Sequence, residues 1–195
     1  MGPEAGYGLR VSDQPIRPVR VTFVCTGNVV RSPVAAALLR RHLDGLPVEV
    51  DSRGVVDIGP VPADAAAILA AYELGVDVRA HRARSFERGE LSDVDLVVGF
   101  EPRHISAAVV DGGAQLGRTF TVTELAGLLE LQHAGGSFAD VIARAAARRR
   151  NPLSSPALAD PVGAGAAEIA RTIRTIDGLV ATIARVLLPP LAARS

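Results

Sequence analysis

The chain has 195 residues, of which 48% are hydrophobic and 22% are charged, proportions that fit one globular domain and argue against a coiled coil or a wholly disordered chain. The 21 basic residues balance the 21 acidic ones, so the composition gives no support to a nucleic-acid partner or an anionic membrane surface. The single cysteine, Cys25, leaves no intrachain disulfide and no thiolate zinc cluster, and it fits a reducing, cytoplasmic location.

Strand and helix patterns alternate along the chain after residue 18. Runs of β-branched and aromatic residues predict three buried strands and a fourth that leads into a helix, at 20–25, 48–54, 94–100 and 118–125. Apolar residues at helical spacing, bounded by Ser, Pro and Gly signals, predict helices at 32–45, 62–75, 102–110, 138–150 and 166–188. This alternation predicts a three-layer α/β/α protein whose parallel sheet is covered by helices on both faces.

The expected organisation is one domain at 19–188 between two short ends. Residues 1–18 carry scattered Gly and Pro without periodicity, which predicts a flexible arm without a signal-peptide pattern. Residues 189–195 are expected to form a C-terminal tail. Residues 134–159 contain the stretches AGGS and NPLSSP and are expected to be a variable, insert-like segment. Because the apolar runs are shorter than the ~20 residues of a membrane span, we expect a soluble protein.

The loop after the first predicted strand carries the candidate site. It reads CTGNVVRSP over residues 25–33, with five residues between Cys25 and Arg31. Ligands of parallel sheets bind at the carboxyl ends of strands, and backbone N–H groups at a helix N-terminus form a concave anion site. Gly27 and Asn28 tolerate the left-handed backbone that such a cradle needs. The predicted phosphate-binding residues are Thr26, Gly27, Asn28, Val29, Val30 and Ser32.

Cys25 and Arg31 give this cradle its chemistry. The planar guanidinium of Arg31 can hold two phosphate oxygens. The positive field of the loop favours the thiolate of Cys25 over its thiol, and Ser32 can donate a hydrogen bond to the sulfur. Cys25 is then a nucleophile that faces a bound phosphoryl group. The alternative is a buried cysteine that acts only as a small hydrophobe at the strand end.

The stretch VTFVCTGNVVRSPVAAALL at 21–39 resembles the V-C-x-G-N-x-C-R-S-P signature of low-molecular-weight protein tyrosine phosphatases. The resemblance continues in chain order through SRG (52–54), PADAAAILAAYELGVDVRAHRARSF (62–86), SDVDLVVGF (92–100) and LADPVG (158–163). It implies a single domain with a four-stranded parallel sheet in the order 2-1-3-4. It also implies that the protein needs no metal and no cofactor.

The activity implied by the resemblance is a cysteine-dependent hydrolysis of protein phosphotyrosine. Cys25 attacks the phosphorus, while Arg31 and the loop amides stabilise the transferred phosphoryl group. Asp160, in the family's Asp-Pro loop, protonates the leaving group and then activates the water that hydrolyses the phosphocysteine. The expected partner is a phosphorylated protein, and we expect a monomer or weak dimer that binds neither nucleic acid nor a membrane.

Several positions depart from the family's pattern and bear on the substrate. Val30 replaces the second cysteine of the loop. Val162 and Gly163 stand where the family usually has aromatic residues that pack on a phosphotyrosine ring, so we expect a thinner ring cleft. Val29 stands where the protein-arginine phosphatases of the family have threonine, which favours phosphotyrosine. A protein-arginine phosphatase stays as an alternative.

Two further alternatives use the same loop. Arsenate can bind the same cradle, and a single cysteine allows only a reductase that uses a small external thiol. The retained Asp160 favours hydrolysis, because reduction needs no such acid. The other alternative is a phosphoprotein-binding module, but binding alone requires neither the nucleophile nor the acid.

Polar residues outside the loop have predicted roles as well. Asn28 and Ser52 are expected to support the loop and Ser32. The stretch AHRARS contains His81, Arg82 and Arg84, which either reach an anionic substrate or form a solvated basic turn. Three histidines lie on predicted helices without the spacing of metal ligands and are expected at the surface: His42, His104 and His133.

Overall fold

The computed structural model describes residues 17–132, 135–151 and 155–194. Within these residues, four parallel strands form one sheet in the order β2–β1–β3–β4, which confirms the predicted α/β class and strand order. The strands are β1 (Val19–Cys25), β2 (Val48–Gly54), β3 (Leu96–Gly99) and β4 (Thr119–Thr121). The helices are α1 (Arg31–His42), α2 (Ala65–Glu73), α3 (Pro102–Val110), the short 3-10 helix η1 (Leu116–Arg118), α4 (Val122–Glu130), α5 (Phe138–Arg148) and α6 (Ala166–Ala192).

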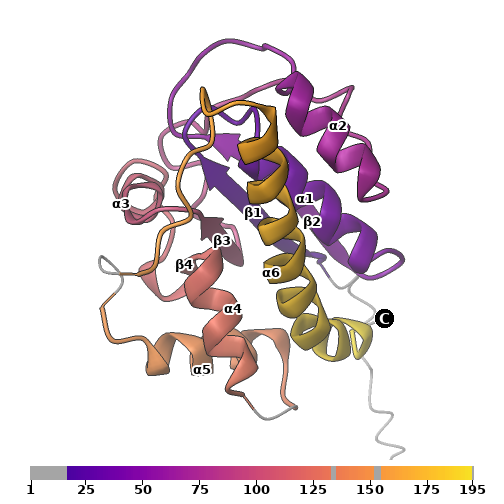
Figure 1. Ribbon diagram of the computed structural model, residues 1–195. Helices are drawn as coiled ribbons and strands as arrows, with labels where there is room; N and C mark the ends of the chain where they lie inside the picture. Colours follow the sequence, from indigo (N-terminus) through magenta and orange to yellow (C-terminus); the bar gives the residue numbers. More distant parts are fainter. Residues whose placement is uncertain (1–16, 133–134, 152–154, 195) are drawn as a thin grey trace, which may run out of the picture.

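Helices cover both faces of the sheet, which gives the three layers (Figure 1). Side chains alternate between the faces along each strand. Phe23 and Val98 belong to the larger core, which is closed by α1, α4 and α6. Val24 and Val97 point to the opposite face and belong to a smaller core with Ala108 of α3. The long helix α6 crosses the larger core and contacts α1, α2 and α4.

Capping side chains set two boundaries that the apolar pattern does not predict. The second helix begins only after Asp64, whose carboxylate accepts hydrogen bonds from the backbone N–H groups of Ala66 and Ala67. The fourth strand ends after three residues, because the hydroxyl of Thr121 accepts from the N–H of Glu124 and starts α4. Both elements are therefore shorter than predicted.

The expected C-terminal tail at 189–195 is in large part helical. The last helix continues through Pro189 and Pro190 to Ala192. Leu187 and Leu191, four residues apart, are both fully buried. Their burial stabilises the last turns even though each proline removes a backbone donor from the helix. The last helix thus extends beyond its predicted end at residue 188, to Ala192.

The same helix is long and apolar enough to cross a membrane, judged by length and composition alone, with a mean hydropathy of 1.4 over its most apolar window. The apolar runs of the sequence are each too short to predict a helix of this kind. Its apolar stripe contains residues that are buried in the larger core: Ile169, Ile173, Ile176, Val180, Ile183 and Leu187. Packing against α1, α2 and α4 therefore accounts for this stripe.

Some predictions lie wholly or partly outside the described residues. The arm predicted at 1–18 is described only at 17–18, and His133 is not described. Within the segment 134–159, the helix predicted at 138–150 is present as α5, whereas residues 134 and 152–154 are not described.

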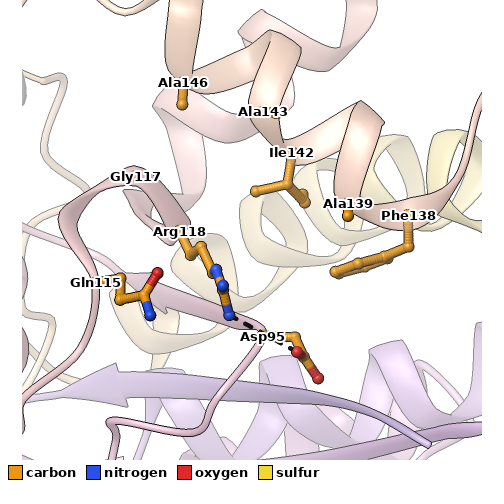
Figure 2. A pocket seen from close by; sticks show the side chains of 9 residues that line it. All are labelled: Asp95, Gln115, Gly117, Arg118, Phe138, Ala139, Ile142, Ala143 and Ala146. Carbon is orange, nitrogen blue, oxygen red and sulfur yellow. Dashed lines mark ion pairs between the residues drawn. The ribbon is translucent and has the colours of Figure 1, made fainter.

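A pocket of about 480 Å³ lies between η1 and α5 (Figure 2). Phe138 and Ile142 of α5 face Arg118, which lies 3.9 Å from the carboxylate of Asp95. Asp95 comes just before β3, and Arg118 comes just before β4. This pocket is therefore at the amino ends of the strands, at the opposite edge of the parallel sheet from Cys25.

Candidate active site

The loop between β1 and α1 lies at the carboxyl edge of the sheet. Cys25 is the last residue of β1, and Arg31 is the first residue of α1. The first strand pairs with β2 on one side and with β3 on the other, so the loop leaves the sheet where ligands of open α/β sheets bind. Both residues are buried, with 3% of Cys25 and 1% of Arg31 exposed.

The sulfur of Cys25 is held by a chain of hydroxyl and amide groups. Its Sγ lies 3.0 Å from Ser32 Oγ. Asn28 Nδ2 donates to Ser32 Oγ and to Ser52 Oγ, at 2.9 Å each. Because Ser32 Oγ accepts from Asn28, its own proton is available for the sulfur or for the carbonyl of Arg53 at 3.3 Å. The predicted support of Ser32 by Asn28, and of the loop by Ser52, is confirmed.

Asn28 also fixes the backbone of the loop. Its φ of 56° is left-handed, as the predicted cradle requires. Its Oδ1 accepts from the N–H of Arg84 at 3.0 Å, and its carbonyl lies 2.7 Å from His81 Nε2, which must donate. Burial lowers the pKa of His81. His81 therefore braces the loop, whereas the exposed guanidinium of Arg84 pairs with Glu90 at 2.7 Å.

The guanidinium of Arg31 contacts two carboxylates. Nη1 donates to Glu101 Oε1 at 2.7 Å and to the carbonyl of Leu158 at 2.9 Å. Nη2 lies 2.5 Å from Asp160 Oδ2 and 3.2 Å from Thr26 Oγ1. Nε is buried and has no hydrogen-bond partner among the residues that the structure describes. An anion in the loop can therefore gain a donor that none of those residues uses.

Asp160 comes from the segment before α6 and lies beside the loop. Its Oδ2 accepts a hydrogen bond from Thr26 Oγ1 at 3.0 Å. Its Oδ1 accepts from the N–H of Val162 at 3.3 Å. About a quarter of the side chain is exposed, so water and substrate can reach it. The structure therefore brings Asp160 to the loop of Cys25 and Arg31, as the sequence predicted.

Residues directly after β3 join the same cluster, although the sequence did not single them out. Glu101 Oε1 accepts from Arg31 and from Arg103 Nη2, the latter at 2.9 Å. Partial burial raises the pKa of Glu101, but hydrogen bonds from the two guanidinium groups lower it by more, so the net direction is downward. Arg103 Nη2 also lies 3.2 Å from Thr26 Oγ1. Their position in the sequence could have predicted this, because they follow a buried strand that ends at the same edge of the sheet.

His104 is buried, with 1% of its surface exposed, and the prediction that it lies at the surface is wrong. Its Nδ1 accepts from the backbone N–H groups of Phe100 and Glu101, at 3.2 Å each. Its Nε2 lies 3.3 Å from Thr26 Oγ1. Burial lowers the pKa of His104 to about 4, and the charge of Arg31 acts in the same direction. The ring turns back to cap its own helix, a contact that helical spacing does not reveal.

The rim of the loop is aliphatic. A Cβ at Gly27 would lie 3.2 Å from Ile58 Cδ1, so Ile58 lies over the loop and leaves little room for a larger residue at 27. Val56 and Ile58 expose nearly half of their surface, and Val162, two residues after Asp160, exposes more than half. These side chains offer apolar surface to the organic part of a substrate.

Comparisons with known proteins show to which family the chain is related. A family model described as low molecular weight phosphotyrosine protein phosphatase matches residues 20–130, more than half of the chain. Etp of Escherichia coli K12, a low molecular weight protein-tyrosine-phosphatase, is 35% identical over 99 residues, which are 51% of this chain and 66% of Etp. The alignment thus spans just under two thirds of that relative.

Arginine phosphatases are also among the relatives. A protein-arginine-phosphatase of Geobacillus stearothermophilus is 34% identical over 108 residues, which are 55% of this chain and 71% of that protein. The solved structure of YwlE arginine phosphatase from the same organism has a TM-score of 0.69 at 24% identity, covering 91% of this chain and 98% of that one, and it shares the fold. From the family match and the shared fold together, the chain belongs to the low-molecular-weight phosphotyrosine protein phosphatase family.

Proposed function

We propose that this chain is a cysteine-dependent phosphatase that hydrolyses phosphotyrosine in proteins through a phosphocysteine at Cys25. The observation that carries the proposal is the contact between Arg31 and Asp160 at the loop of Cys25. A nucleophile, an anion-binding arginine and a carboxylate meet there at one sheet edge. A phosphoprotein-binding module would need the arginine, but it would need neither the sulfur nor the carboxylate.

In the first step, the sulfur of Cys25 attacks the phosphorus, and the bond from phosphorus to the tyrosine oxygen breaks. Arg31 and the loop N–H groups stabilise the charge on the transferred phosphoryl group. Asp160 gives its proton to the departing phenolate. The free Nε of Arg31 supports this step, since phosphate can use it without displacing a protein group that the structure describes.

In the second step, water attacks the phosphorus, and the bond from sulfur to phosphorus breaks. Asp160, now ionised, takes the proton of that water. The hydroxyl of Ser32, 3.0 Å from Cys25 Sγ, stabilises the thiolate that leaves. Hydrogen phosphate leaves, Cys25 returns to the thiolate and Asp160 keeps the proton that it needs for the next turnover, so the two steps balance without a metal or a cofactor.

The aliphatic rim supports phosphotyrosine as the substrate. Val56, Ile58 and Val162 offer apolar contacts to a phenyl ring, and Val29 adds a β-branched side chain in the loop. Phosphoarginine is the second candidate. Asp57 places a carboxylate on the rim between Val56 and Ile58, where a substrate guanidinium can pair with it. The alignment with the Geobacillus arginine phosphatase supports the same alternative.

We further propose that the protein acts in the cytoplasm as a monomer or weak dimer, and that it binds neither nucleic acid nor a membrane. The single cysteine and the balanced charge support this setting. The burial of the apolar stripe of α6 supports it as well. The same loop can bind arsenate, but the placement of Asp160 beside Arg31 supports hydrolysis over reduction.

The test is phosphate release from three matched peptides that carry phosphotyrosine, phosphoarginine or phosphoserine. We expect turnover of the phosphotyrosine peptide, none with Cys25→Ser, and a rate at least ~10²-fold lower with Asp160→Ala, within the range that general acid–base catalysis contributes. The control is Asp111→Ala, which removes an exposed carboxylate whose ion pair, with Arg88, is 3.9 Å long. Turnover of the phosphoarginine peptide alone would show that phosphoarginine, and not phosphotyrosine, is the substrate. A lack of phosphate release from all three peptides would contradict the proposal.

A further inference from the structure

We propose that Thr26 and His104 are positioning residues that orient Asp160 for both of its proton transfers. The inference rests on the proposed phosphatase function. It adds two side chains that neither attack nor hold the phosphate: a buried histidine, and a threonine hydroxyl between it and the acid. Their geometry also selects which oxygen of Asp160 carries the transferred proton.

The hydroxyl of Thr26 is surrounded by four polar groups. Asp160 Oδ2 lies at 3.0 Å, and His104 Nε2 lies at 3.3 Å. The Nη2 atoms of Arg31 and Arg103 lie at 3.2 Å each. A hydroxyl has one proton to give and two lone pairs to accept with. Both guanidinium groups can only donate, so the Thr26 proton goes to Asp160 Oδ2 or to His104 Nε2.

The tautomer of His104 follows from a similar count. Nδ1 faces two backbone N–H groups, those of Phe100 and Glu101. Nδ1 must therefore accept, and in a neutral ring the proton lies on Nε2. The lowered pKa, about 4, keeps the ring neutral near pH 7. The chain of hydrogen bonds thus has one direction, from His104 to Thr26 and from Thr26 to Asp160.

This direction divides the two oxygens of Asp160 into separate tasks. Oδ2 accepts from Thr26 and lies against Arg31. Oδ1 accepts one longer bond, from the N–H of Val162 at 3.3 Å. When phosphate draws the guanidinium of Arg31 toward itself, the Thr26 hydroxyl still holds Oδ2. The geometry therefore assigns the transferred proton to Oδ1.

The test uses a series of aryl phosphates whose phenols differ in acidity, with kcat/KM as the measure of the first chemical step. A poor leaving group needs the proton of Asp160, whereas an acidic phenol leaves with little help. Thr26→Val keeps the shape of the side chain and removes the hydroxyl. We expect it to lower kcat/KM about tenfold for the least acidic phenol, a fraction of the ~10²–10⁴-fold effect of general acid–base catalysis. The fall should be much smaller for the most acidic phenol.

Two variants of His104 separate its two ring nitrogens. In His104→Asn, the amide oxygen can replace Nδ1 as the acceptor for the backbone, but no donor reaches Thr26. In His104→Gln, the amide nitrogen can reach the place of Nε2. We expect His104→Asn to show the same leaving-group dependence as Thr26→Val. His104→Gln and Thr26→Ser should restore most of the activity on the poor leaving group.

Double variants test whether these residues act through Asp160. In an Asp160→Ala background, Thr26→Val and His104→Asn should cause no further fall in kcat/KM. Thr119→Val is the matched control, because it removes a buried hydroxyl that bonds the carbonyl of Gln115 outside the site. It should leave the leaving-group dependence as in the wild type. An equal loss on all phenols, or a further loss without Asp160, would overturn the proposal.

A second readout does not depend on activity. Nitrogen-15 NMR of the histidine rings, with the signal of His104 assigned by its absence in His104→Asn, reports the tautomer. We expect the Nε2–H form at pH 7, and the Nδ1–H form would overturn the proposed chain of hydrogen bonds from His104 through Thr26 to Asp160. A wild-type protein that hydrolyses no aryl phosphate would instead overturn the proposed function, and with it the role of these hydrogen bonds in catalysis.

Discussion

At the scale of single residues, Asn28 connects the loop between β1 and α1 to its surroundings. It reaches Ser32 and Ser52 through Nδ2 and Arg84 through Oδ1, with a left-handed backbone. Without this side chain, the hydroxyl of Ser32 loses the hydrogen bond from Asn28 Nδ2 that leaves its own proton available for the sulfur of Cys25. The loop is therefore expected to lose both its shape and its support for the thiolate.

A pair of variants separates these two effects. Asn28→Gly keeps the left-handed backbone without strain, whereas Asn28→Ala adds a cost of roughly 1 kcal/mol. We expect both to lower kcat/KM at least about tenfold, because each loses a hydrogen-bond network worth roughly 1 kcal/mol per bond. Only Asn28→Ala should show the additional loss of stability in urea unfolding. Wild-type kcat/KM in Asn28→Gly would show that the backbone alone shapes the loop.

His104 makes the stability of the protein depend on pH. Its folded pKa, about 4, lies below the ordinary value of 6.5 because the ring is buried. Between these two pH values the unfolded chain binds a proton that the folded ring does not bind, so acid favours unfolding. Over this window the free energy of unfolding should fall by at most roughly 3 kcal/mol from this group.

Urea unfolding at pH 7 and at pH 4.5 measures this contribution. His104→Asn has no titrating ring at this position, so its free energy of unfolding should fall less between the two pH values than that of the wild type. The carboxylates titrate in both proteins and cancel in the difference. An equal fall in both proteins would contradict the prediction, because it would mean that the His104 ring binds its proton as readily in the folded state as in the unfolded chain.

At the scale of elements, the end of α6 is the clearest case of packing that overrides a local signal. Leu191 follows two prolines and is fully buried, whereas Leu188, on the same helix, is 44% exposed. We expect Leu191→Ala to lower the free energy of unfolding by about 2–5 kcal/mol, the usual cost of truncating a buried leucine. Leu188→Ala is the control and should change it by less than about 1 kcal/mol. Similar effects of the two would indicate that the helix frays before Leu191.

Strands and helices were predictable where one apolar face repeats over the whole element. The second strand has the predicted bounds, and the sheet order is as the family resemblance implies. The ends were less predictable, since Asp64 and Thr121 cap helices inside the apolar pattern. The two prolines near Ala192 gave no sign that the helix continues, because that depends on a core formed by other elements.

The candidate site also has a part that the sequence predicts and a part that it does not. Residues 25–32 form one contiguous motif, so the sequence predicts them together. Glu101 and His104 come from a different segment, and their roles arise only when β3 ends beside β1. A histidine on a helix gives no sign by itself that it will turn back and become buried. Position after a buried strand is the one general signal that pointed to both.

At the scale of the whole molecule, three segments that are far apart in the sequence meet at the carboxyl edge of the sheet. The loop after β1 supplies Cys25 and Arg31, the start of α3 supplies His104, and the segment before α6 supplies Asp160. The pocket beside α5 lies at the other edge and shares none of these residues (Figure 2). The residues of the proposed mechanism thus lie together at the edge where parallel sheets bind their ligands.

The most direct test of the proposed mechanism is to trap the phosphorylated enzyme. The protein is mixed with a labelled phosphotyrosine peptide, quenched within milliseconds, and cleaved after arginine. Cys25 then lies in the peptide of residues 21–31, between the cleavage sites Arg20 and Arg31. We expect one phosphoryl group on that peptide in the wild type and none in Cys25→Ala, which leaves neither a sulfur nor a hydroxyl at this position. Phosphate release without label on residues 21–31, or label on that peptide in Cys25→Ala, would contradict the proposed mechanism.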